Sequence, residues 1–160
     1  MADTVTGPST ETTLYMRRTF AVPVQRMFEA WTQPEILTKW FSTGDDYSTP
    51  VAEVDFRVGG RYRISMRHIA KGVVHTATGI YREIVPGKKL VFTWSWEEEV
   101  GAAETIVTVE MRDLGGSTEL SLTHELFPNK IHRDNHEKGW FGCLDKLART
   151  VARGDAPPRA

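Results

Sequence analysis

The chain has 160 residues, of which 40% are hydrophobic, and its 20 basic and 21 acidic residues give a formal net charge of −1. This length suits one domain with a sizeable core, and the even mixture of charges leaves no basic stripe, so nucleic acid is not an expected partner. Cys143 is the only cysteine, which excludes an intrachain disulfide and a cysteine-rich zinc site.

The two ends of the sequence differ in composition from the rest. The first residues, MADTVTGPSTETT, lack the basic start and apolar run of a secretory signal, and no later segment reaches the roughly 18 apolar residues of a membrane span. We therefore expect a cytoplasmic protein without a membrane span. Residues 1–12 and 154–160 have the composition of disordered, flexible tails, which leaves a single predicted domain over residues 13–153.

The first predicted elements are one strand and two short helices. Hydrophobic residues alternate with others from Leu14 to Val22, which predicts a strand, and Arg18 interrupts its apolar side. An inward Arg18 could hold a ligand carboxylate or enolate, but an ion pair with Glu29 or a helix terminus is the preferred interpretation. Pro23 and Pro34 each suit a helix start, and the segments VQRMFEAW and PEILTKWF that follow them carry apolar residues at helical spacing.

The middle of the chain predicts six strands in a meander. From Val51 onward the hydrophobic pattern has a period of two, and turn sequences interrupt it at residues 58–60, 71–72, 86–89, 100–101 and 114–116. One face of the resulting sheet is apolar. Its predicted members are Tyr62, Ile64, Met66, Leu90, Phe92, Trp94, Trp96, Leu120, Leu122, His124 and Leu126.

A long amphipathic helix is predicted to close the chain over about residues 130–152, with Asn129 as its N-cap. A sheet of about seven antiparallel strands with one apolar face packs most economically by curling around such a helix. We therefore predict an α+β fold with a curved sheet wrapped around the C-terminal helix. The helix residues expected to face the sheet are His136, Trp140, Cys143, Leu144, Leu147, Ala148 and Val151.

Several segments resemble the homologues of the activator of heat-shock chaperone ATPase, within the START-like superfamily of helix-grip proteins. The resemblance covers Leu14 to Val151 and is carried by an Ala-Trp, Pro-Glu, Trp-Phe series at residues 30–41, VGGRYR, VPGKKLVFTW and a late Gly-Trp. It implies a β-α-α-β6-α fold around a deep, mainly apolar cavity. The superfamily includes carriers, sensors, aromatic polyketide cyclases and hydrolases, so the resemblance implies no single reaction.

The preferred functional interpretation is a carrier or sensor that binds an apolar or aromatic molecule, lipid-like or polyketide-like, without a cofactor. The first alternative is an enzyme of the cyclase, dehydratase or hydrolase type in the same cavity, and the second is a chaperone-interaction module related to stress response. Whether the chain forms a homodimer is left open. The side chains expected to line the cavity are Trp40, Phe41, Tyr62, Ile64, Met66, Tyr81, Phe92, Trp94, Trp96, Leu122, His124, His136, Trp140 and Leu144.

Three histidines, His124, His132 and His136, are expected near one end of this cavity. In the structural interpretation His136 bonds a backbone carbonyl or Glu125, His124 is a satisfied sheet histidine and His132 lies in water. In the functional interpretation they are polar anchors for a ligand. His124 and His136 are also the candidates for a general base in the enzyme alternative. No metal site is predicted, because the i, i+4 pair of His132 and His136 lacks a third ligand. The acidic run at residues 97–99 indicates a solvated loop.

Overall fold

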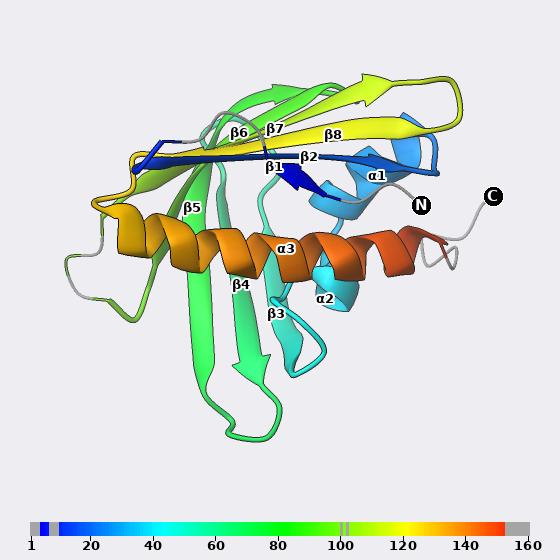
Figure 1. The fold of residues 1–160 in the computed structure, drawn as a ribbon. Helices are drawn as coiled ribbons and strands as arrows, with labels where there is room; N and C mark the ends of the chain where they lie inside the picture. Colours follow the sequence, from blue (N-terminus) through cyan, green and yellow to red (C-terminus); the bar gives the residue numbers. More distant parts are fainter. Residues whose placement is uncertain (1–3, 7–9, 100, 102, 153–160) are drawn as a thin grey trace.

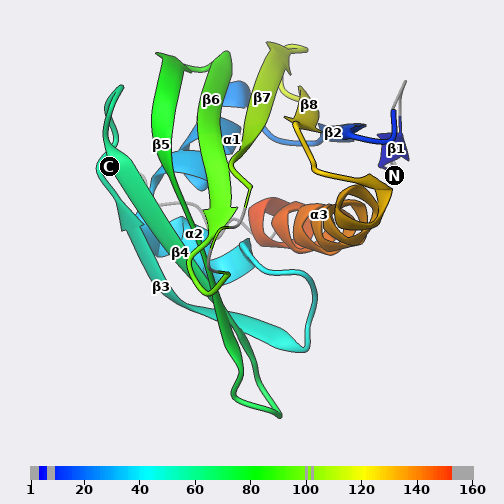
Figure 2. The ribbon, with the colours of Figure 1, turned by 90° about the vertical axis from the view of Figure 1, so that its left-hand side faces the viewer.

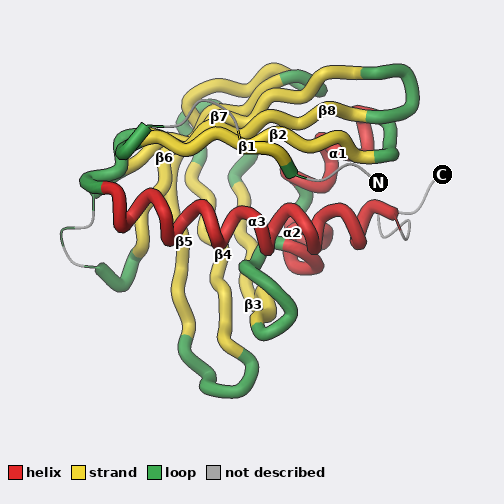
Figure 3. The backbone as a smooth tube through the Cα atoms, in the orientation of Figure 1, coloured by secondary structure: helices red, strands yellow, loops and turns green. Residues whose placement is uncertain are grey.

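The computed structural model describes residues 4–6, 10–99, 101 and 103–152, and shows a curved antiparallel sheet with a long helix across its concave side (Figure 1; Figure 3). Residues 154–160 of the predicted tails lie outside this range, as do residues 1–3 and 7–9. The elements are β1 (Val5–Thr6), β2 (Thr13–Phe20), α1 (Val24–Thr32), α2 (Pro34–Trp40), β3 (Tyr47–Val54), β4 (Arg61–His68), β5 (Val74–Val85), β6 (Lys89–Trp96), β7 (Thr105–Asp113), β8 (Thr118–Glu125) and α3 (Lys130–Ala152).

The strands form one antiparallel sheet in the order β1-β2-β8-β7-β6-β5-β4-β3. From β3 to β8 each strand pairs with its neighbour along the chain, which confirms the predicted meander, and β2 closes on β8 with Met16 opposite Leu122. The two-residue β1 adds a short edge beside β2. Seen end-on, α3 lies inside the curve of the sheet (Figure 2). The predicted α+β helix-grip fold is therefore confirmed.

The turn sequences end the strands where the pattern predicted. Gly72 and Gly87 have φ angles of 74° and 72°, in the left-handed region that glycine adopts without strain. Each lies in the turn of a hairpin, the first between β4 and β5 and the second between β5 and β6. The glycine-containing turns therefore set the lengths of the strands that surround the concave face.

The strand alternation predicted the inward side chains correctly up to the end of β8. Tyr62, Ile64 and the other predicted members up to His124 are buried, apart from the half-buried Trp96. The inward placement of Leu126 was wrong: its side chain is 56% exposed, and the residue has a φ of 71°. This left-handed residue breaks the alternation after Glu125, so Phe127, which is 4% exposed, takes the inward place. The conformation costs a non-glycine residue about 1–2 kcal/mol.

The C-terminal half of α3 fills the middle of the concave face. Its buried residues start at Trp140, whose indole ring stacks on Trp31 of α1 with centroids 6.0 Å apart. At the other end, the Asn129 side chain accepts the His132 amide proton at 3.0 Å, which confirms the predicted cap. The buried residues of this helix are Trp140, Cys143, Leu144, Leu147, Thr150 and Val151. Among the described residues no helix, α3 included, is long and apolar enough to span a membrane.

A close backbone contact fixes α3 against the segment after α2. A methyl group on Gly142 would lie 1.6 Å from the carbonyl oxygen of Thr43, so only glycine allows this approach. One turn on, Lys146 Nζ donates to Ser42 Oγ at 2.6 Å and to the carbonyls of Gly44 and Tyr47 at 3.3 and 3.2 Å. Burial lowers the pKa of Lys146, and these three acceptors take up its donors.

A second anchor joins α3 to the sheet. Arg18 of β2, only 6% exposed, donates from Nη1 to Asp145 Oδ1 at 2.6 Å. The expected pairing of Arg18 with Glu29 or a helix terminus was wrong, because its partner is the side chain of Asp145 within α3. With the contacts of Gly142 and Lys146, this ion pair holds the C-terminal half of α3 from two sides.

The variant Gly142→Ala should lower the free energy of unfolding by about 1–3 kcal/mol, because the added methyl group displaces α3 from Thr43. Thermal or urea unfolding measures the change. Gly44→Ala is the matched control, since nothing lies within 4 Å of its added methyl group and its stability should change by less than about 0.5 kcal/mol. Equal stability of the two variants would show that the close contact is not required.

Candidate functional site

A pocket of about 540 Å³ lies between α3, mainly its N-terminal half, and residues of β4, β5 and β6 on the concave side of the sheet. The strands contribute mainly large side chains, and the helix contributes Trp140 together with polar and small residues. The lining residues are Thr43, Tyr47, Met66, His75, Trp94, Trp96, Glu99, His132, Asn135, His136, Gly139, Trp140 and Cys143.

The sequence of α3 explains why a pocket forms at this end. Buried side chains start only at Trp140, and the preceding turn presents Gly139 to the sheet. A methyl group added to Gly139 would contact only Thr43 Cγ2, at 3.4 Å. Because glycine has no side chain to fill the concave face there, the space between helix and sheet stays open.

His124 is part of a buried hydrogen-bond chain beside the pocket. Trp140 Nε1 donates to His124 Nδ1 at 3.1 Å, so the ring proton lies on Nε2, which donates to Thr105 Oγ1 at 2.7 Å. The Thr105 hydroxyl in turn donates to the carbonyl of Trp94 at 3.0 Å. His124 is fully buried, and burial lowers its pKa well below the usual 6.5, with His136 adding to the effect. The ring is therefore neutral and both nitrogens have partners.

His136 has the same pattern of contacts at the rim. Trp96 Nε1 donates to His136 Nε2 at 3.0 Å, and His136 Nδ1 donates to the carbonyl of His132 at 2.7 Å. Burial lowers its pKa, although the bond to the His132 carbonyl opposes that effect. His136 and Trp96 line both the main pocket and a second hollow of about 280 Å³ on the side of Phe127. Their hydrogen bond thus lies in the wall shared by the two spaces.

The structure distributes the predicted lining residues over three places. Met66, Trp94, Trp96, His136 and Trp140 line the main pocket. Phe41, Tyr62, Ile64, Tyr81 and Phe92 surround a void of only about 10 Å³ beneath α2. The last group, Trp40, Leu122, His124 and Leu144, is fully buried in the core. Aromatic packing thus fills one half of the predicted cavity, and the other half remains open.

Several pocket residues were not predicted from the sequence. Asn135 and Gly139 continue the inward stripe of α3 toward its N-terminus, but neither is apolar. His75 lies opposite Met66 in the pairing of β4 with β5. The predicted hairpin turn at residues 71–72 could therefore have indicated that His75 lies beside a predicted lining residue. Cys143 also lines the pocket, and burial raises the pKa of its thiol to about 12, so the group is protonated at neutral pH. Among the described residues, no cluster of three acidic, histidine or cysteine side chains is suited to a metal ion.

Comparison with known proteins identifies the family. The profile described as Activator of Hsp90 ATPase homolog 1-like protein matches residues 21–152. The chain belongs to this family. Protein CV1439 from Chromobacterium violaceum, a solved structure, is 30% identical to this member, with a TM-score of 0.79 over 88% of this chain and 97% of that chain. The family resemblance stated from the sequence is confirmed.

Two further solved structures are similar to this family member. The AHSA1 protein from Silicibacter pomeroyi is 25% identical, with a TM-score of 0.78 over 89% of this chain and 99% of that chain. CalU16 from Micromonospora echinospora is 22% identical, with a TM-score of 0.67 over 94% and 83%, and shares the fold. No curated protein matches the chain significantly.

Acidification from about pH 7 to about pH 5 should lower the free energy of unfolding. The unfolded chain takes up protons on histidine near pH 6.5, whereas the native rings of His124 and His136 have lowered pKa values and resist protonation. The lowered pKa values of Asp45, Glu97 and Asp134 act in the same direction but at lower pH. Urea unfolding at several pH values measures the slope.

The variant His124→Gln is the comparison for this pH dependence. It is expected to be less stable than the parent at pH 7 but to lose less stability on acidification, because one of the two resisting rings has been removed. Identical slopes for parent and variant would contradict the role assigned to His124.

Proposed function

We propose that the protein binds an apolar or aromatic small molecule, lipid-like or polyketide-like, in the 540 Å³ pocket, as a carrier or sensor. The observation that carries this proposal is an open space of that size bordered by Trp94, Trp96 and Trp140. Ligand pockets typically have volumes of about 300–1,000 Å³ and combine an apolar lining with a few polar groups. This pocket has both features.

The apolar wall supplies a large part of the binding energy. A ligand that buries about 300 Å² of apolar surface gains about 7 kcal/mol at about 25 cal/mol per Å². Micromolar affinity requires about 8 kcal/mol after association costs have been met, so the polar groups of the wall must add to this value.

Binding has more support than catalysis by the predicted histidines. Both ring nitrogens of His124 and of His136 are engaged in hydrogen bonds within the protein. A general base needs a free nitrogen within reach of the substrate proton, and His124 does not line the pocket. The enzyme alternative would therefore require rearrangement of His136. A chaperone-interaction role would use the outer surface and is the second alternative.

The variant Gly139→Leu should abolish binding while leaving the fold intact. Its side chain extends into the pocket, and replacing a glycine inside a helix stabilises it by about 0.5–1 kcal/mol. Titration with Nile red, a neutral fluorescent probe, should show at least tenfold weaker binding than in the parent. Thermal unfolding should show equal or higher stability.

Gly139→Ala is the matched control, because its methyl group occupies little of the pocket and contacts only Thr43. It should bind the probe almost as well as the parent. Parent-like binding by Gly139→Leu, or no binding by the parent, would refute the proposed site.

A further inference from the structure

We propose that the ligand of this pocket is a cation: a flat aromatic or amphiphilic molecule that carries a quaternary or protonated amine. This inference rests on the proposed binding function and adds the charge of the ligand. It follows from three observations: the charged groups in the pocket wall, the pairing of the surrounding charges, and the arrangement of the indole rings.

The wall of the pocket contains a single carboxylate and no permanent positive charge among the described residues. Glu99 is the only acidic lining residue, and neither lysine nor arginine lines this pocket or the second hollow. His136, the most buried histidine in the wall, is neutral, since its Nε2 accepts a hydrogen bond from Trp96 Nε1. An anionic ligand such as a fatty acid would have no counter-charge here, whereas a cation has one.

The cationic side chains of α3 that come nearest to the pocket are held by other groups. Lys146 donates to Ser42 Oγ and to the carbonyls of Gly44 and Tyr47. Arg133 donates from Nη2 to Asp134 at 2.6 Å and lies near Glu137. Arg149 pairs with Asp45. None of these charges is available to a ligand in the pocket.

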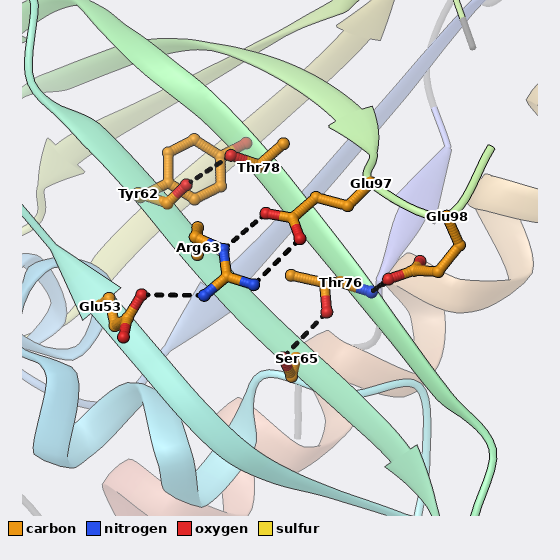
Figure 4. A network of polar contacts seen from close by, with 8 residues as sticks. All are labelled: Glu53, Tyr62, Arg63, Ser65, Thr76, Thr78, Glu97 and Glu98. Atoms are coloured by element: carbon orange, nitrogen blue, oxygen red, sulfur yellow. Dashed lines mark hydrogen bonds and ion pairs between the residues drawn. The ribbon is translucent and has the colours of Figure 1, made fainter. Parts of the chain in front are cut away.

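The three carboxylates of the acidic run at residues 97–99 make different contacts. Glu97 pairs with Arg63 of β4, which also contacts Glu53 of β3 (Figure 4). Both carboxylate oxygens of Glu98 accept the amide proton of Thr76 at 2.9 Å (Figure 4). Glu99 lines the pocket instead, with no side-chain hydrogen bond or ion pair to the described part of the chain. All three carboxylates are exposed, as expected of a solvated loop, and Glu99 lies at the exposed rim of the pocket.

The three indole rings of the wall are inclined to one another. Trp94 and Trp96 have centroids 5.4 Å apart with planes at 87°, and Trp94 and Trp140 have centroids 5.4 Å apart with planes at 48°. Tyr47 adds a fourth aromatic ring to the wall. An aromatic face attracts a cation by about 0.5–2 kcal/mol, and several aromatic rings around one site form the cages that recognise quaternary ammonium groups.

Three naphthalene ligands of different charge test this inference, and the first two have the same shape. They are (2-naphthylmethyl)trimethylammonium, its neutral isostere 2-neopentylnaphthalene and the anion 2-naphthoate, each measured by displacement of Nile red. The cation should bind at least about fivefold more tightly than the neutral isostere, and the anion most weakly. In Glu99→Gln the preference for the cation should fall severalfold, and in Glu99→Lys it should be lost or reversed.

Glu110→Gln is the matched control, because this exposed carboxylate of β7 does not line the pocket and its removal changes the net charge equally. It should keep the parent preference. Equal or tighter binding of the neutral isostere or of the anion would overturn the inference while leaving the proposed binding function intact. The same preference in parent and Glu99→Gln would also overturn the assignment to Glu99. Absence of binding by all three ligands and by Nile red would refute both proposals.

Discussion

The position of α3 is set by one backbone contact, and the rest of the site depends on it. At Gly142 the helix touches the carbonyl of Thr43 so closely that no side chain fits between them. Lys146 and the Arg18–Asp145 pair then hold the same half of the helix from the α2 side and from the sheet. Because all three contacts are at or beyond residue 142, the N-terminal half is joined to the sheet only through His136 and Trp140 among its described side-chain hydrogen bonds, and it lies over the open part of the concave face.

Two tryptophan–histidine hydrogen bonds connect this helix to the sheet, and they differ mainly in depth. In the core, Trp140 of the helix donates to His124 of β8. At the rim the direction is reversed, since Trp96 of the sheet donates to His136 of the helix. Each bond requires a neutral imidazole, so the same chemistry secures the buried side of the pocket and forms the partition between its two hollows.

Much of the fold could be predicted from the sequence, because alternation and turn residues are local signals. They placed the meander, the two short helices and the long capped helix. They did not predict β1 or the start of β3 at Tyr47, and they failed where Leu126 adopts a left-handed conformation that no period reveals. The site was less accessible to the same reasoning. Hydrophobicity marked Tyr62 and Phe92 as lining residues, yet neighbouring rings fill the space around them. It missed Asn135 and Gly139, because the opening depends on small and polar residues that a search for apolar side chains passes over.

The topology also orders the assembly of the molecule in time. Every hairpin from β3 to β8 joins segments that are adjacent in the chain, and such short-range pairings close faster than distant ones. A polypeptide leaving the ribosome N-terminus first can complete all of them before residues 130–152 have emerged. Until then α3 does not cover the concave face that bears Trp94 and Leu122. The nascent chain therefore exposes this hydrophobic surface until α3 docks and forms the pocket.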